Sequence, residues 1–153
     1  MRLRIICKSK IHHATVTAAD LHYAGSIGID RALLRRTDIV AGEQVAVWNV
    51  SNGQRIETYA IELAEGSGQV VVNGAAARHF QPGDRIIVAA FCLTDEAVVP
   101  RMIAVDERNA YVADLVTVAT DVPSPREQPH AHAQLRRLPV RPTDGESRRR
   151  TPR

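Results

Sequence analysis

The sequence predicts a mostly β protein in the form of a small barrel. Runs rich in Val, Ile, Thr and Leu recur along residues 1–118 and are separated by short polar or glycine-containing turns. Such residues favour strands, and short strands at close spacing with few helices are typical of a small β-barrel. A chain of 153 residues has the length of one domain, and its aromatic content of only 4% requires an aliphatic core.

The chain begins with a weakly alternating run at 2–7, which we expect to form the first strand. We expect a polar connection at 8–13. The β-branched residues within 14–19 favour a second strand. A turn at 20–25 then leads into a third strand at 26–30.

Asp30 is expected to cap a short helix at 31–36, because its carboxylate can accept a hydrogen bond from a free N–H of the first helical turn. After a turn at 39–43, the pair Asn52-Gly53 lies between two alternating runs. This is the strongest short-range hairpin signal in the chain. The two strands of the hairpin are expected at 44–50 and 54–63.

The following part of the chain contains a single helical turn, expected at 74–79, and a near-continuous apolar run at 85–93 that suits a buried strand. Thr94 could cap a short helix at 95–99, which would end at Pro100. The remaining strands are expected at 69–73, 101–105 and 110–113, and the remaining turns at 65–68 and 81–84.

Composition excludes several classes of protein. No apolar run approaches the roughly 18 residues that a membrane helix needs, so no membrane partner is expected. The basic N-terminus lacks the extended apolar stretch and cleavage site of a signal peptide, which predicts a cytoplasmic protein. Cys7 and Cys92 lie in apolar contexts and are interpreted as small buried hydrophobic residues. No Cys/His cluster has zinc spacing, so no metal is expected.

Residues 119–153 have a different composition and are expected to form a disordered tail beside a domain at 1–118. From Asp121 onward, eight arginines stand against four acidic residues, so the tail carries +4 and the rest of the chain −1, which gives the net charge of +3. Arg148-Arg149-Arg150 could bind nucleic acid, but no aromatic residue is interleaved to stack on bases. A solvated basic tail is the favoured interpretation.

One dipeptide in the predicted turn could carry chemistry, namely Gly25-Ser26 within Tyr23-Ala24-Gly25-Ser26-Ile27. Glycine leaves its carbonyl carbon open to attack and tolerates strained backbone angles. The serine hydroxyl could attack that carbonyl and convert the amide into an ester. Elimination would leave dehydroalanine, and its hydrolysis a pyruvoyl group. On the dipeptide alone, an ordinary loop is the far commoner interpretation.

The surrounding sequence resembles the pyruvoyl-dependent aspartate 1-decarboxylases. Blocks with the order and spacing of that family cover roughly residues 1–115 and lie at 10–12, 18–30, 47–55, 58–61, 72–77 and 84–91. The resemblance implies a six-stranded double-psi β-barrel, assembled as a homotetramer with active sites between subunits. It also implies a proenzyme that cuts itself and then converts L-aspartate to β-alanine and carbon dioxide, on the path to pantothenate.

The resemblance also implies roles for individual residues. Ser26 becomes the covalent pyruvoyl group, which forms a Schiff base with the substrate amine and acts as the electron sink. Thr58 assists the cleavage after Gly25 by hydrogen bonding to its carbonyl. Tyr59 donates a proton to the carbanion that is left when carbon dioxide departs. Without the resemblance, a half-buried strand aromatic is the better interpretation of Tyr59.

Substrate binding is expected to depend on fixed positive charge, because aspartate carries two carboxylates. The planar guanidinium of Arg55 suits bidentate carboxylate binding, with Lys10 and His12 beside it. Side chains alternate along a strand, so Arg55 and Tyr59 share a face but their backbones lie roughly 13 Å apart. Both can therefore serve one small ligand only from its two ends or across a subunit boundary. The pocket lining is expected from Asn73, Gly74, Ala75, Ala76, Tyr23 and Trp48.

Two questions stay open at the level of sequence. A rival interpretation is a non-catalytic β-barrel binding module whose basic tail holds nucleic acid. The two interpretations differ in the state of the Gly25-Ser26 bond, which is cut only in the decarboxylase. Cleavage could be spontaneous or could need an accessory maturation factor, and the sequence does not distinguish these.

Overall fold

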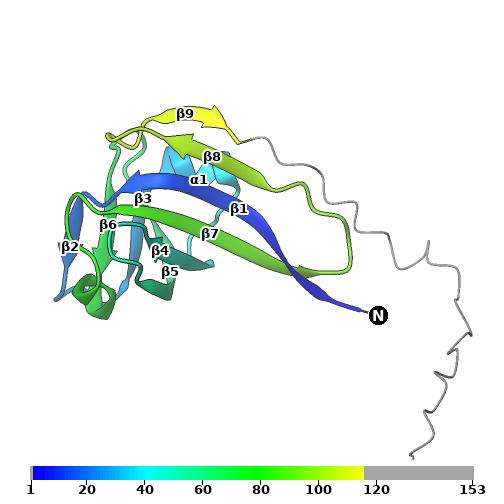
Figure 1. Ribbon diagram of the computed structural model, residues 1–153, viewed down its shortest axis with the longest axis horizontal. Helices are drawn as coiled ribbons and strands as arrows, with labels where there is room; N and C mark the ends of the chain where they lie inside the picture. Colours follow the sequence, from blue (N-terminus) through cyan, green and yellow to red (C-terminus); the bar gives the residue numbers. More distant parts are fainter. Residues whose placement is uncertain (1, 116–153) are drawn as a thin grey trace, which may run out of the picture.

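Strands dominate the structure, a computed structural model that describes residues 2–115 (Figure 1). The mostly β prediction is confirmed, and the described residues contain one α-helix. The elements in chain order are β1 (Arg4–Thr15), β2 (Ala18–Asp20), β3 (Ser26–Asp30), α1 (Arg31–Thr37), β4 (Gln44–Asn49), β5 (Arg55–Leu63), β6 (Val70–Asn73), η1 (Gly74–Arg78), β7 (Arg85–Thr94), β8 (Arg101–Val105) and β9 (Tyr111–Asp114).

Six of the strands form a closed ring in the order β6-β3-β5-β4-β7-β1. The ring closes because β1 continues through Val16 and Thr17 into β2, which pairs in parallel with β6. At the junction the Thr17 N–H donates a 2.7 Å hydrogen bond to the Val70 carbonyl. A second pair, β3 with β5, is also parallel, and the other four pairs of neighbours around the ring are antiparallel. This is the six-stranded double-psi barrel that the resemblance implies, and β8 and β9 extend its sheet beyond β1.

An aliphatic core fills the barrel, as the scarcity of aromatic residues requires. Ile11, Ile27, Val47 and Val88 are each 0% exposed and come from four different strands. Full burial of one such side chain contributes roughly 1.5–3 kcal/mol. Phe80 is the only aromatic residue of the core cluster in the described part of the chain. The packing of these branched side chains fixes the positions from which the site residues project.

Strand β1 corrects the polar connection expected at 8–13, because this segment lies within a continuous strand. Buried positions alternate there with less buried ones, since Ser9 and Ile11 are 0% exposed whereas Lys10 and His12 are only partly buried. Long-range pairing with β7 and β8 supplies the hydrogen bonds that hold the segment extended. Irregular register between Ile11 and Ala14 marks a β-bulge in this strand.

Helix α1 begins where the sequence predicts. The Asp30 carboxylate accepts a 2.8 Å hydrogen bond from the Ala32 N–H and so caps the first turn. It also accepts hydrogen bonds from the N–H groups of Gly66 and Gly68, at 2.9 and 2.8 Å. One buried carboxylate thus joins the end of β3, the start of α1 and the turn after β5.

The helix expected at 95–99 is absent from the described residues, and this prediction was wrong. Thr94 is the last residue of β7, and its hydroxyl accepts a 3.0 Å hydrogen bond from the Glu96 N–H in a local turn. No residue of 95–99 is buried, so no packing against the core stabilises a helix in this segment.

Three further expectations concern the chain as a whole. Cys7 and Cys92 are free and partly buried, and burial raises the pKa of the Cys7 thiol. Among the described residues, no helix is long and apolar enough to span a membrane. The tail expected at 119–153 lies outside the described residues.

Candidate active site

Gly25 and Ser26 occupy a strained backbone at the entry to β3. Their φ angles are 102° and 104°, and Ser26 is 2% exposed. Glycine adopts such a φ readily, whereas a serine there is uncommon and costs on the order of 1–3 kcal/mol. The bond between these two residues therefore lies in a conformation that the surrounding structure must enforce.

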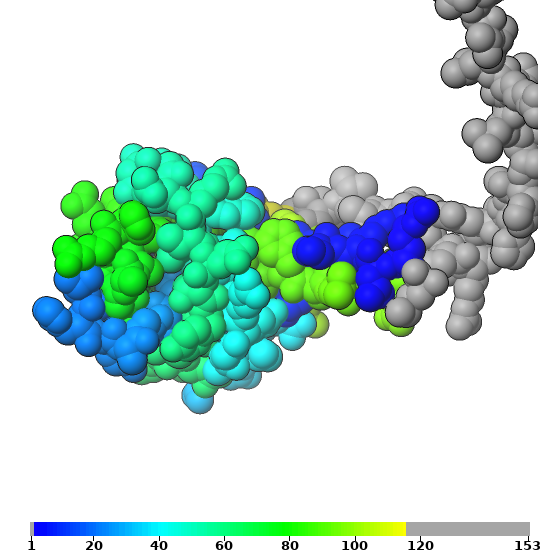
Figure 2. All heavy atoms as spheres, turned by 90° about the horizontal axis from the view of Figure 1, so that it is seen from below, coloured from blue at the N-terminus to red at the C-terminus, as the bar shows by residue number. Residues whose placement is uncertain are grey.

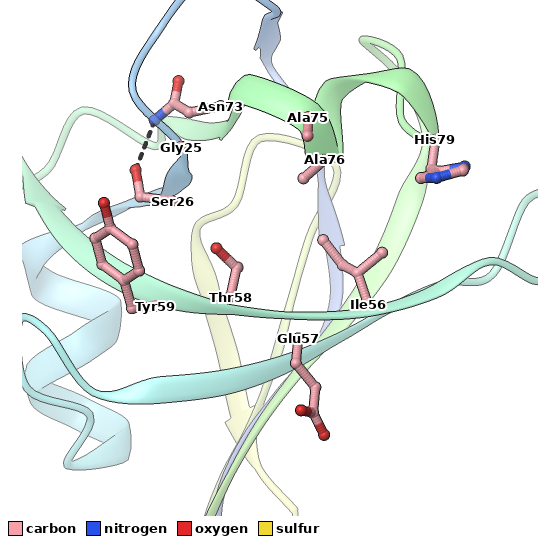
Figure 3. A pocket seen from close by; sticks show the side chains of 10 residues that line it. All are labelled: Gly25, Ser26, Ile56, Glu57, Thr58, Tyr59, Asn73, Ala75, Ala76 and His79. Atoms are coloured by element: carbon pink, nitrogen blue, oxygen red, sulfur yellow. Dashed lines mark hydrogen bonds between the residues drawn. The ribbon is translucent and has the colours of Figure 1, made fainter.

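Strand β6 holds this segment in place through Asn73. The register of the antiparallel pair β3 and β6 sets Ser26 directly opposite Asn73. The Asn73 side-chain amide donates a 3.0 Å hydrogen bond from Nδ2 to Ser26 Oγ (Figure 3). Asn73 is only 4% exposed, so water competes little for this bond. The hydroxyl of Ser26 is thereby held in one orientation at the wall of a cavity.

The cavity beside Ser26 has a volume of about 350 Å³ and is bounded by β3, β5, β6 and η1 (Figure 3). It brings together seven of the residues that the sequence suggests for the site: Gly25, Ser26, Thr58, Tyr59, Asn73, Ala75 and Ala76. Its lining also contains three residues that sequence reasoning missed, Ile56, Glu57 and His79.

Alternation along β5 explains how this strand contributes to the cavity. Ile56 and Thr58 are partly buried and project into the cavity, whereas the Glu57 side chain points away from it (Figure 3). Tyr59 is 45% exposed, and its ring rises at the Ser26 end of the cavity (Figure 3). Ile56 could have been found from its two-residue spacing to Thr58. No sequence signal points to His79, which enters through the end of η1.

Lys10, His12, Trp48 and Arg55, here called the outer-face cluster, do not line the cavity. Ile11 and Val47 point into the core, so their neighbours Lys10, His12 and Trp48 face the other way. Trp48 pairs across the sheet with Arg55, and the Arg55 guanidinium lies 4.9 Å from the centre of the Trp48 ring. The structure thus divides the predicted site residues into two groups.

His12 is the most constrained member of the outer-face cluster. Its ring stacks on that of His13 at 3.8 Å between centroids and an interplanar angle of 18°. Its Nδ1 atom is buried, and the described residues offer it no hydrogen-bond partner. Burial lowers the pKa of His12, and the neighbouring His13 and Lys10 lower it further. The neutral imidazole is therefore the favoured form.

Tyr23 and Gly74, also suggested by the sequence, lie at the edges of the site. Tyr23 belongs to the turn before β3 and is 51% exposed, outside the cavity lining. Gly74 is the first residue of η1 and is buried against the backbone of Gly25. Within the described residues, no group of three or more His, Cys, Asp or Glu side chains could hold a metal ion.

Comparisons with known proteins agree on one family. The aspartate decarboxylase family model matches residues 1–112. The aspartate 1-decarboxylase of Myxococcus xanthus is 54% identical over 113 residues, which cover 71% of this chain and 87% of that protein. That of Burkholderia ambifaria is 46% identical over 111 residues, 69% of this chain and 87% of that protein.

One further relative and one solved structure complete the comparison. The aspartate 1-decarboxylase of Hyphomonas neptunium is 58% identical over 85 residues, 56% of this chain and 72% of that protein. A rationally designed protein, mkDPBB_sym_86, is 17% identical with a TM-score of 0.39, over 50% of this chain and 90% of the design. That structural likeness lies below the level that identifies a shared fold.

Proposed function

Because the chain belongs to the aspartate decarboxylase family, we propose that it converts L-aspartate to β-alanine and carbon dioxide, a step toward pantothenate. The match to the family model spans residues 1–112, which include the whole barrel and both groups of site residues. The rival interpretation, a non-catalytic module with a nucleic-acid-binding tail, has no comparable support. A cytoplasmic location and the division at residue 118 stay predictions.

The observation that carries the proposal is the strained Gly25-Ser26 bond at the cavity wall, with Ser26 buried. The Ser26 hydroxyl attacks the Gly25 carbonyl carbon, and its proton passes to the amide nitrogen, so the amide becomes an ester with a free amine. Loss of the Ser26 α-proton then expels the Gly25 carboxylate and leaves dehydroalanine. Water replaces the amine as ammonia, and residue 26 becomes a pyruvoyl group at a new N-terminus.

The residues around Ser26 fit the group that this cleavage would form. Asn73 donates to Ser26 Oγ, the atom that leaves with the Gly25 carboxylate, so its Nδ2 donor is then free beside the pyruvoyl group, and the one acidic side chain of the cavity lining, Glu57, points away from the cavity (Figure 3). A pyruvoyl group supplies an electron sink for decarboxylation, as pyridoxal phosphate does elsewhere. Thr58 is proposed to stabilise the developing oxyanion of Gly25, and Tyr59 to hold the proton that replaces the departing carboxylate.

The outer-face cluster is proposed to bind the carboxylates of aspartate in the cavity of a second copy. Arg55 points away from the cavity of its own chain, so assembly is the simplest way to bring both groups to one ligand. A homotetramer is consistent with the apolar arm where β1 begins and β7 ends. Ile5 and Leu93 on this arm are 75% and 64% exposed, and the arm protrudes from the barrel (Figure 2).

Intact mass spectrometry tests the proposed processing. The purified protein is expected to contain two chains, residues 1–25 and 26–153, with the larger chain resistant to Edman sequencing because a pyruvoyl group lacks an α-amine. Ser26→Ala is expected to leave a single chain with no decarboxylase activity, since no hydroxyl remains to attack. A wild-type chain that stays whole after prolonged warming, alone and with a host-cell extract that could supply a maturation factor, would contradict the proposal.

A further inference from the structure

Gly74 makes an unusually close backbone approach to the bond proposed to be cut. A Cβ atom at Gly74 would lie 2.8 Å from Gly25 Cα, 2.9 Å from Gly25 N and 3.0 Å from the Tyr23 carbonyl oxygen. Real Cβ atoms essentially never come within 3.0 Å of such atoms. Because all three atoms belong to the backbone, no side-chain rotation could make room. Gly74 can therefore be replaced only if the segment before Ser26 moves.

Positive φ angles occur on both sides of this contact. Gly25 and Ser26 have φ of 102° and 104°, and Gly74 has φ of 64°. The residue before Gly74 is Asn73, which pairs with Ser26 in the sheet and donates to its hydroxyl. At the junction of β6 and η1, Asn73 thus contacts the scissile segment through its side chain, and Gly74 contacts it through its backbone.

We propose that Gly74 is a positioning residue for self-cleavage, which acts by letting the backbone at the junction of β6 and η1 close against Gly25. This contact keeps the Gly25-Ser26 segment from relaxing out of its positive-φ conformation while Asn73 fixes the hydroxyl. A Cβ at position 74 would displace Gly25 by several tenths of an ångström and separate its carbonyl carbon from the attacking oxygen. Misplacement of reacting groups by about 1 Å can cost on the order of 10²-fold in rate. The inference rests on the proposed function.

Steric contact and backbone conformation must be separated, because any substitution at Gly74 also meets the penalty of a positive φ. Asn tolerates this left-handed region far better than Ala does, but it carries the same Cβ. Gly66 provides a matched control, since its φ is 77° and a Cβ added there would have nothing within 4 Å. Gly74→Ala and Gly74→Asn are therefore compared with Gly66→Ala and Gly66→Asn.

The experiment follows cleavage of freshly purified precursor by intact mass, with the thermal midpoint of each variant measured alongside. Hydroxylamine, which cuts esters, reports the fraction of chains that have reached the ester. Both Gly74 variants are expected to fold, to cleave at least roughly tenfold more slowly than wild type, and to hold a smaller ester fraction. Both Gly66 variants are expected to cleave at the wild-type rate.

Three outcomes would overturn the inference. Wild-type cleavage in Gly74→Asn would mean that the position needs only a positive φ. Equal slowing in the Gly66 variants would trace the effect to general destabilisation. Failure of both Gly74 variants to fold would give the residue a structural role in place of a positioning one. A wild-type chain that never cleaves is a different result, because it contradicts the proposed function itself.

Discussion

The scissile segment and the outer-face cluster differ in the interactions that determine their chemistry, although β5 contributes residues near both. Around Gly25 and Ser26 the determinants are backbone conformation, burial and one amide hydrogen bond. In the outer-face cluster the determinants are charged and aromatic side chains on the outer surface of the sheet. The contrast suggests that cutting the chain requires strain within one copy, whereas binding aspartate requires charge that a neighbouring copy can supply.

Tyr59 bridges the two regions, because it shares a face of β5 with Arg55 and still lines the cavity. Tyr59→Phe is expected to cleave normally, since the reaction of Ser26 does not need the phenol. Turnover of aspartate is expected to fall by roughly 10²-fold or more, because a positioned proton donor contributes that much. Steady-state β-alanine formation by the fully cleaved variant measures the effect.

Tyr111→Phe is the matched control for this change, since Tyr111 is, like Tyr59, an exposed tyrosine on a strand but does not line the cavity. It is expected to keep wild-type turnover. A normal rate in Tyr59→Phe would assign the proton donor elsewhere, with Tyr23 and a bound water as the next candidates.

Arg55→Lys tests the outer-face cluster alone. Lysine keeps the positive charge but loses the planar fork that binds a carboxylate through two hydrogen bonds. A hydrogen bond to a charged group contributes about 1.5–3 kcal/mol, so kcat/KM for aspartate is expected to fall by roughly tenfold or more. Cleavage at Ser26 is expected to be unchanged, as measured by the same mass assay. Loss of cleavage in Arg55→Lys would show that the outer-face cluster also takes part in processing at Ser26.

Arg36→Lys controls for the stacking that Arg55 makes, because Arg36 also lies over an aromatic ring. It is expected to leave kcat/KM unchanged.

Coexpression of Arg55→Lys with Tyr59→Phe tests whether one active site uses residues from two copies of the chain. Mixed oligomers would contain some sites with an intact cavity and an intact outer-face cluster, so activity should exceed that of either variant alone. An activity equal to the mean of the two would place both groups in one copy.

Local signals allowed much of the barrel to be predicted. The strand at 26–30, the capped helix after it and the Asn52-Gly53 hairpin agree with the structure, since each depends on a few neighbouring residues. The segment at 8–13 could not be recognised, because its polar side chains hide a strand that long-range pairing with β7 and β8 stabilises. The helix expected at 95–99 is absent although Thr94 is a plausible cap, because none of these residues is buried against the core.

The candidate site could likewise be predicted only where local motifs indicate its residues. Gly25, Ser26, Thr58 and Asn73 were suggested by motifs, and the structure brings them to one cavity. The close approach of Gly74 to Gly25 has no signature in the sequence, since it depends on the pairing of β3 with β6 across more than forty residues.

The smallest expected effect concerns His12, whose pKa is lowered chiefly by burial, with His13 and Lys10 adding to the shift. Between the lowered pKa of the folded protein and the ordinary value of about 6.5, the unfolded chain binds more protons. The free energy of unfolding should therefore fall as the pH drops through this window, and His12→Gln should weaken that dependence.

Thermal midpoints of the Ser26→Ala precursor at pH 5 and pH 7, with and without His12→Gln, measure this effect apart from catalysis. An identical pH dependence with and without His12→Gln would mean that His12 titrates like a solvated side chain. The buried Nδ1 atom of His12 would then carry no pH-dependent contribution to the free energy of unfolding.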